Sequence, residues 1–174
     1  MSFDDANAFL LQQGSKSYSF ENLGDRITGT IVNMEKRNAT DPQTGAVQTF
    51  QSGQAKELIV MTLQTEMRDD DADDGVRSIW MKGGNFTATE GRGTSGMRAL
   101  LDALTASGKR AYEKGGKLTV VHTGLAAPKQ RGFNPAKLFM AKYEPPTAQV
   151  SIDDLFGTTA GAGANDPFAE TDPF

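Results

Sequence analysis

The sequence predicts an all-β domain: a five-stranded Greek-key barrel with one helix between its third and fourth strands, followed by a flexible C-terminal tail. Three observations predict this fold class. Five segments have the apolar, β-branched composition of strands, and a segment with helical periodicity lies between the third and the fourth. After residue 146 the sequence changes to small and acidic residues, which cannot bury enough apolar surface to become ordered.

The five expected strands are bounded by glycine, proline and other turn residues. They cover residues 26–34, 57–65, 76–82, 117–123 and 138–143. Gly29 inside the first of them indicates a bend or a bulge, which barrels use to turn corners. Pro145 and Pro146 end the last strand because neither nitrogen can donate to a ladder.

The expected helix lies between the third and fourth strands. Apolar residues recur at helical spacing from Met97 to Leu104, Thr94 or Ser95 can cap the first turn, and Gly108 is placed to end the helix. Three strands, a helix and two strands is the order of elements in an OB-fold. An SH3-like barrel also has five strands, but it usually lacks such a helix.

Length and composition limit the classes of protein to which the chain can belong. The 174 residues suffice for one domain with a core, and a hydrophobic share of 37% indicates that part of the chain stays solvated. There is no run of eighteen apolar residues, so we expect no membrane span. Asp4 and Asp5 stand where a secretory signal carries positive charge, so we expect a cytoplasmic protein. The absence of cysteine excludes disulfides and thiolate metal sites.

Charge is segregated along the chain. Residues 23–145 carry 17 basic and 14 acidic residues, and six of those acids lie with one base in residues 66–74. Without this acidic segment the same region has 16 bases and 8 acids, whereas residues 146–174 have five acids and no base. Such segregation is expected of a phosphate-binding face beside acidic segments that stay in solvent.

The residues indicate neither an enzyme nor a bound metal or cofactor. The single histidine, His122, lies within an expected strand and no cysteine is present, so zinc and Cys-His mechanisms lack their ligands. The carboxylates of residues 69–74 lack the spacing of an EF-hand, and a mobile, solvated hairpin loop is expected there. The glycine-rich residues 91–96 lack the Gly-Lys-Ser/Thr ending of a phosphate-binding loop.

Nucleic-acid binding is better supported, because single strands are held by a basic groove with aromatic rings on which bases stack. If Ile79 and Met81 face the core, pleat alternation puts Ser78, Trp80 and Lys82 on the opposite face. Trp80 would then be a platform for a base. The alternative is that Trp80 completes the core and its neighbour Arg77 is the exposed residue.

Two loops extend this candidate interface. The segment 128–137 combines three cations with one phenylalanine, and in an OB-fold the loop between the last two strands contributes to ligand contact. Lys36, Arg37 and Phe50 border the first long loop, and an ordinary solvated loop is the alternative in both places. The candidate DNA contacts are Arg37, Phe50, Arg77, Trp80, Lys82, Lys129, Arg131, Phe133, Lys137 and Lys142.

The chain ends in Asp172-Pro173-Phe174. Phe174 combines a hydrophobic ring with a free carboxylate, two residues after an acid. A partner protein could take the ring in an apolar pocket and the carboxylates on an arginine or a lysine. The alternative is a tail that only improves solubility, but solubility does not require a terminal phenylalanine. We therefore predict a partner-binding peptide at this tip.

With barrel, aromatic residues and tip placed, the chain resembles bacterial and bacteriophage single-stranded-DNA-binding proteins, in which an acidic tail ends in an Asp-x-Pro-Phe-like peptide. Here the tip is Asp172-Pro173-Phe174, without the extra residue. Residues 74–83 and 137–146 look more like an actinobacterial-virus branch of such proteins. The long loop at 39–55 and the acidic loop at 66–75 depart from the compact bacterial pattern.

This resemblance implies an N-terminal arm at residues 1–22, a DNA-binding OB domain at 23–146 and a partner-binding tail at 147–174. It implies coating of single-stranded DNA in replication, recombination and repair, and recruitment of replication or recombination proteins through the tip. It also implies action without a cofactor, in the host bacterial cytoplasm if the chain is viral, and a possible homo-oligomer. The rival hypotheses are a docking protein that uses Asp-Pro-Phe peptides and a virion structural protein, and both predict no affinity for oligonucleotides.

Overall fold

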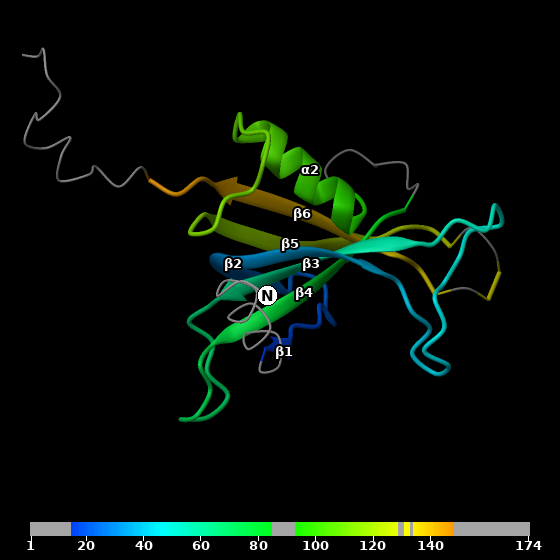
Figure 1. Cartoon of the computed structure of the whole chain (residues 1–174), viewed down its shortest axis with the longest axis horizontal. Coiled ribbons are helices and arrows are strands. Elements are labelled where there is room, and N and C mark those ends of the chain that lie inside the picture. Colours follow the sequence, from blue (N-terminus) through cyan, green and yellow to red (C-terminus); the bar gives the residue numbers. More distant parts are fainter. Residues whose placement is uncertain (1–14, 85–92, 129–130, 133, 148–174) are drawn as a thin grey trace, which may run out of the picture.

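The computed structural model describes residues 15–84, 93–128, 131–132 and 134–147, and it confirms an all-β fold (Figure 1). All the strands in these residues belong to one mixed sheet in the order β1-β4-β3-β2-β5-β6. Along the chain the elements are β1 (Lys16–Ser17), β2 (Arg26–Asn38), β3 (Glu57–Gln64), β4 (Val76–Lys82), α2 (Gly96–Ala106), β5 (Lys117–Leu125) and β6 (Lys137–Glu144). The five strands and the helix that the sequence predicts are therefore present, and β1 is additional.

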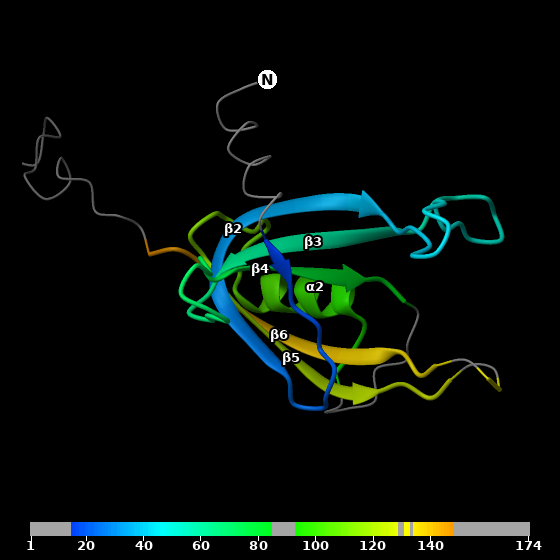
Figure 2. The ribbon, with the colours of Figure 1, turned by 90° about the horizontal axis from the view of Figure 1, so that it is seen from below.

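The long central strand β2 belongs to both halves of the sheet. Residues Arg26–Thr30 pair with β5, and Thr30–Asn38 pair with β3, with a register shift after Ile31. Figure 2 shows β2 curving between the two halves, with α2 lying behind the space that they enclose. The bend expected at Gly29 lies beside this change of partner, where a Cβ atom would stand 2.7 Å from the carbonyl oxygen of Gln64. Glycine is thus required by a close approach of two backbones.

The ladders among the described residues do not close the sheet into a ring, so the closed five-stranded barrel is not confirmed. The short strand β1 pairs in parallel with β4, and the N–H of Tyr18 donates to the carbonyl of Ser78 at 2.9 Å. The segment thus pairs with that edge of β4 at Arg77 and Ser78. Phe20, which follows β1, contacts β6 through its side chain, because its ring packs on that of Phe139 at 5.1 Å.

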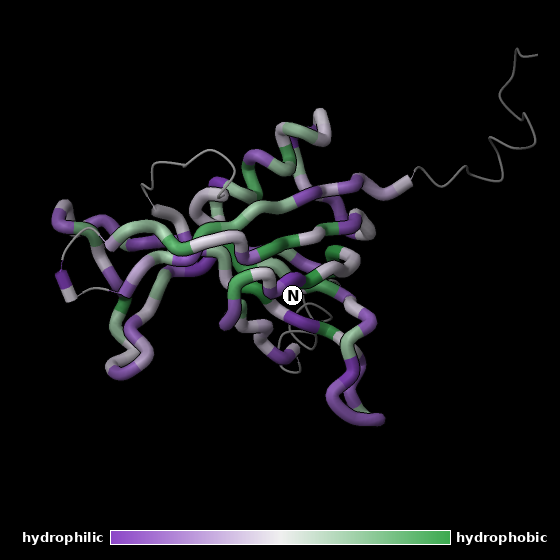
Figure 3. The backbone as a smooth tube through the Cα atoms, turned by 180° about the vertical axis from the view of Figure 1, so that it is seen from behind, coloured by the Kyte–Doolittle hydropathy of each residue, from purple (hydrophilic) through white to green (hydrophobic). Residues whose placement is uncertain are grey.

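The core lies between the two halves of the sheet and the helix. Its fully buried side chains are Ile27, Met61, Leu63, Ile79, Met81, Leu118 and Val120. Leu100 and Ala103 of α2 complete it. Along the backbone, hydrophobic stretches follow the strands and hydrophilic ones gather in the projecting loops (Figure 3).

The helix agrees with its expected boundaries but not in every detail. Ser95 is at the N-cap, yet its side chain makes no capping hydrogen bond, and Gly108 follows the C-terminus with a φ of 74°. Leu101 is exposed although it belongs to the apolar repeat, because the core contacts only the stripe that carries Leu100.

Candidate nucleic-acid interface

A groove of about 550 Å³ lies on the side of the sheet where three segments meet. The first is the segment before β2, the second is the end of β4, and the third is the start of β6. Its lining residues are Ser17, Tyr18, Ser19, Phe20, Trp80, Lys82, Gly83, Ala136, Lys137 and Phe139. The groove thus has four aromatic rings and two lysines, the combination that single-stranded nucleic acid requires.

Trp80 is on the outer face of β4 with 44% of its surface exposed, while its neighbours Ile79 and Met81 are completely buried. This is the arrangement that pleat alternation predicts for a strand with one face on a core. The indole Nε1–H donates to the hydroxyl of Ser17 at 3.3 Å, so the ring is held at the wall of the groove. Ser78 shares this face but is buried, because β1 covers it.

Arg37 lies against Trp80 although 43 positions separate the two in the sequence. The ladders put Arg37 of β2 opposite Leu58 of β3, and Leu58 opposite Lys82 of β4, so all three share the face of Trp80. The guanidinium carbon of Arg37 lies 5.4 Å from the centre of the indole ring. A cation in this position is attracted to the ring face. Arg37 also forms an ion pair with Glu35.

The floor of the groove is aromatic. Phe20 is buried and meets Tyr18 and Phe139 edge to face, with ring centres 4.9 Å and 5.1 Å apart. The ammonium group of Lys137 donates to the carbonyl oxygen of Phe20. A positive charge is therefore fixed above an apolar surface, which suits a ligand with flat rings and anionic groups.

Arg77 does not belong to this groove. Its side chain lies on the core side of β4 and is buried, and it forms two hydrogen bonds with the carboxylate of Asp73, one of them 2.9 Å long. The hydrogen bond to Arg77 holds the pKa of Asp73 far below its usual range, with help from the N–H groups of Asp69 and Gly75. Inclusion of Arg77 among the DNA contacts therefore does not fit the structure, and of the two alternatives Trp80 is the exposed residue.

One aspartate of the acidic loop is buried, although the sequence predicts a solvated loop. Asp73 is buried within it and accepts hydrogen bonds from the N–H of Asp69 and of Gly75, each 2.9 Å long. A mobile, solvated loop was expected because five of the residues from 69 to 74 are aspartates. Composition alone could not show that one of these carboxylates turns inward to a buried arginine.

The remaining candidate residues lie apart from the groove or outside the described residues. Phe50 is exposed in the loop between β2 and β3, with the ammonium of Lys56 5.6 Å from its ring centre. Arg131 is exposed in the loop between β5 and β6. Lys142 is exposed, opposite in the pleat to buried Tyr143, and pairs with Glu144 at 3.1 Å. Five predicted site residues lie outside the described residues: Lys129, Phe133, Asp172, Pro173 and Phe174.

Sequence reasoning missed the segment before β2 as part of the site. Its residues Ser17-Tyr18-Ser19-Phe20 alternate polar and aromatic side chains, which is the period of a strand. Four residues are too few to carry that signal alone. The buried Phe20 is what fixes the segment against the domain.

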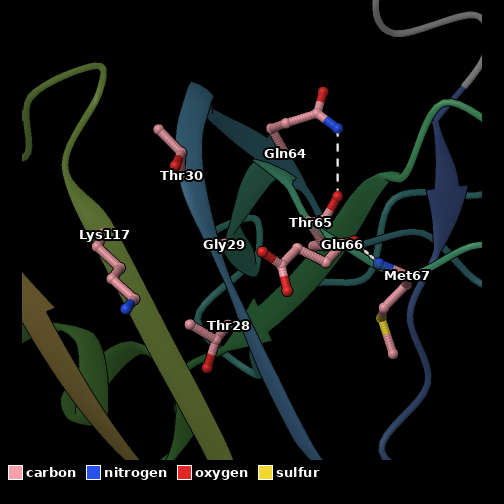
Figure 4. A pocket seen from close by; sticks show the side chains of 8 residues that line it. All are labelled: Thr28, Gly29, Thr30, Gln64, Thr65, Glu66, Met67 and Lys117. Atoms are coloured by element: carbon pink, nitrogen blue, oxygen red, sulfur yellow. Dashed lines mark hydrogen bonds between the residues drawn. The ribbon is translucent and has the colours of Figure 1, made fainter.

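A second pocket, of about 480 Å³, lies at the bend of β2 (Figure 4). It is lined by Thr28, Gly29, Thr30, Gln64, Thr65, Glu66, Met67 and Lys117. Several of its polar groups bind one another: the Gln64 amide donates to the carbonyl oxygens of Thr65 and Asp74, and the Met67 N–H to the Thr65 hydroxyl. With no aromatic ring and with Glu66 as well as Lys117 in its lining, it is the poorer place for a nucleic acid.

In the part of the chain that the structure describes, no helix is both long and apolar enough to cross a membrane. The same residues contain no group of three or more acidic or histidine side chains placed to hold a metal ion. His122 is buried in β5, with each ring nitrogen within 3.0 Å of a backbone carbonyl oxygen, that of Asn22 or Gly124.

Comparison of the chain with protein-family models, with curated proteins and with solved structures gives no match. Function must therefore be argued from the groove itself.

Proposed function

We propose that this protein binds single-stranded DNA in the groove between β4, β6 and the segment before β2. The observation that carries the proposal is Trp80, half-exposed on the outer face of β4 with Arg37 over its ring and Lys82 on the same face. The indole is not part of the main core, and it lies beside cations. This is the arrangement on which a base stacks while its phosphate is neutralised.

The groove favours single strands over duplexes. The exposed ring of Trp80 can stack only on a base that is free of its neighbours, whereas the bases of a duplex are stacked on one another. Base–aromatic stacking contributes about 1–3 kcal/mol per base and tolerates any sequence. The protein should therefore bind single strands with little sequence preference.

The proposed fold is an OB-fold whose ring is completed by side chains and by the segment before β2. In OB-folds the second and third strands, together with the loops after the first and fourth strands, bind oligonucleotides. Here those elements are β3, β4, and the loops that follow β2 and β5. The two loops project from the same end of the sheet (Figures 1 and 2). Phe50 and Arg131 lie in them, so a longer strand could reach both.

The acidic C-terminal segment is proposed to recruit replication or recombination proteins through Asp172-Pro173-Phe174. The proposed location is the bacterial cytoplasm, which is that of the host cell if the chain is viral. The support for this is the sequence itself. Residues 146–174 carry five acids, no base and three phenylalanines, two of them directly after a proline. Acidic residues keep such a segment in solvent while its rings remain available to a partner pocket.

Titration with oligo-dT tests DNA binding directly, because Trp80 is the single tryptophan of the chain. We expect its fluorescence to be quenched on binding and the affinity to fall steeply as salt is raised. A duplex of the same length should compete poorly. Absence of binding at low salt, both in fluorescence and in a mobility assay with labelled oligo-dT, would contradict the proposal and favour a protein-docking or virion structural role.

A further inference from the structure

The segment Ser15–Phe20, here called the strap, forms one wall of the groove yet has little backbone pairing to hold it. Its strand β1 is two residues long. Beyond that pairing, the hydroxyl of Ser15 lies 2.7 Å from that of Ser78, and Ser17 accepts the indole N–H of Trp80. The N–H of Tyr18 and the buried Phe20 hold the second half of the strap, whereas its first half depends on side-chain contacts. The hydrogen bond to Ser17 links the indole of Trp80 to that first half.

One of these contacts joins the strap to the acidic loop, 66–75. The ammonium of Lys16 lies 3.2 Å from a carboxylate oxygen of Asp69 and 3.4 Å from one of Asp73. Lys16 is opposite Arg77 in the β1–β4 ladder, and Arg77 binds the same Asp73. A hydrogen bond to Asp69 also raises the pKa of Lys16, as expected for an ammonium among carboxylates.

The acidic loop is a firm anchor for this contact. Asp73 is buried, and both of its oxygens accept hydrogen bonds from Arg77 and from backbone N–H groups within the loop. Lys16 and Asp69 are accessible, with side chains 46% and 64% exposed, and the equally exposed Asp70 lies 4.0 Å from the ammonium of Lys16. Lys16→Gln leaves both members of the buried Arg77–Asp73 pair in place. Asp69 lies 3.5 Å from the guanidinium of Arg77, so the melting temperature of Asp69→Asn must be compared with that of the wild type.

We propose that Lys16 and the acidic loop form a clasp that positions the strap, and through it Trp80, for DNA binding. This inference rests on the proposed function of the groove. It gives the acidic loop a structural role in DNA binding, whereas charge repulsion alone would make the loop unfavourable for DNA binding. Six carboxylates near a DNA-binding groove should repel DNA, but here three of them, Asp69, Asp70 and Asp73, lie at the ammonium of Lys16 in the strap.

Two variants with opposite changes of charge separate the clasp from electrostatics. Lys16→Gln removes a positive charge and Asp69→Asn removes a negative one. If charge alone acts, the first weakens DNA binding and the second strengthens it. If the clasp acts, both loosen the strap, so both weaken binding. From the contribution of an exposed ion pair we expect each to weaken oligo-dT binding about two- to fivefold.

Trp80 reports the strap without DNA. In both variants acrylamide should quench Trp80 more strongly than in the wild type, because the Ser17 wall is no longer held against the indole. Lys16→Arg should show the acrylamide quenching and the oligo-dT affinity of the wild type, since arginine keeps the positive charge. The control is Arg98→Gln on α2, which removes the same charge from an exposed ion pair 2.9 Å long and should leave Trp80 unchanged.

The outcomes distinguish a failure of the clasp from a failure of the proposed function. Tighter binding by Asp69→Asn, or unchanged quenching of Trp80 in both variants at an unchanged melting temperature, would overturn the clasp. If the wild type does not bind oligo-dT, the proposed function fails. Increased quenching in both variants, restored by Lys16→Arg, would in that case still establish that the clasp positions the strap.

Discussion

At the scale of single residues, the position of Trp80 follows from the alternation of β4. Ile79 and Met81 are completely buried, so the residue between them must face outward. Sequence reasoning could predict this face but not its neighbours. That Arg37 lies on the ring depends on the register of two ladders, and a sequence read by itself does not give that register.

Trp80→Ala should weaken oligo-dT binding about 10- to 100-fold, since a stacked base contributes about 1–3 kcal/mol. Trp80→Phe should keep part of this affinity because it keeps a ring. Binding is measured by anisotropy of labelled oligo-dT, because the variants lack the fluorophore. Leu101→Ala, another exposed apolar residue but on α2, serves as control and should bind as the wild type does. An equal loss in that control would assign the effect to general damage.

Asp73→Asn should lower the melting temperature at neutral pH, because it leaves the buried Arg77 without its ionised partner. The pKa of Asp73 is lowered in the folded state, so ionised Asp73 stabilises the fold fully above the unfolded-state pKa of about 3.9. Its contribution is lost as the pH falls below that value toward the lower folded-state pKa. The gap in melting temperature between wild type and variant should therefore narrow in acid.

The comparison for this prediction is Asp71→Asn, an exposed position in the same acidic loop. Thermal melts of both variants between neutral and acidic pH are sufficient. A gap that stays constant over that range would show that the charge of Asp73 does not stabilise the fold.

At the scale of elements, the strands with a clear period were predictable and the shortest one was not. β4 has the boundaries that its sequence predicts, Val76–Lys82, because glycine and a run of acids precede it. β1 gives no such signal, since two residues cannot show a period. The order of the elements predicts a closed ring, whereas the ladders of the described residues form an open sheet with β1 paired to its edge strand β4.

Gly29→Ala tests the bend of β2. The new Cβ would lie 2.7 Å from the carbonyl oxygen of Gln64 and 2.9 Å from the Cβ of Leu63, both in a fixed strand. Such overpacking typically costs about 1–3 kcal/mol of unfolding free energy, which urea denaturation can measure. Thr30→Ala, at the next and exposed position, should change stability much less. Equal stability of Gly29→Ala and wild type would show that the two strands can separate at this point.

At the scale of the whole molecule, charge and binding are divided between parts of the chain. The full chain has a net charge of −4, which by itself argues against a polyanionic ligand. The groove nevertheless gathers Lys82 and Lys137, and Arg37 lies over its tryptophan. Sequence analysis could find this division by counting charges along the chain. It could not foresee that the acidic loop lies against the strap, because that contact joins residues 53 positions apart.

Deleting residues 147–174 should preserve or strengthen DNA binding while abolishing capture of partner proteins. The deletion removes five acids and no base, which changes the net charge from −4 to +1. Less repulsion should raise the affinity for oligo-dT at low salt, and the gain should shrink as salt screens the remaining charges. A full-length variant with all five acids changed to their amides should show the same gain, which separates charge from chain length.

Pull-down through the immobilised full chain, with Phe174→Ala as the matched variant, measures partner capture. Loss of oligo-dT binding by a truncated chain with an unchanged melting temperature would mean that the tail belongs to the DNA site and not to a separate docking function.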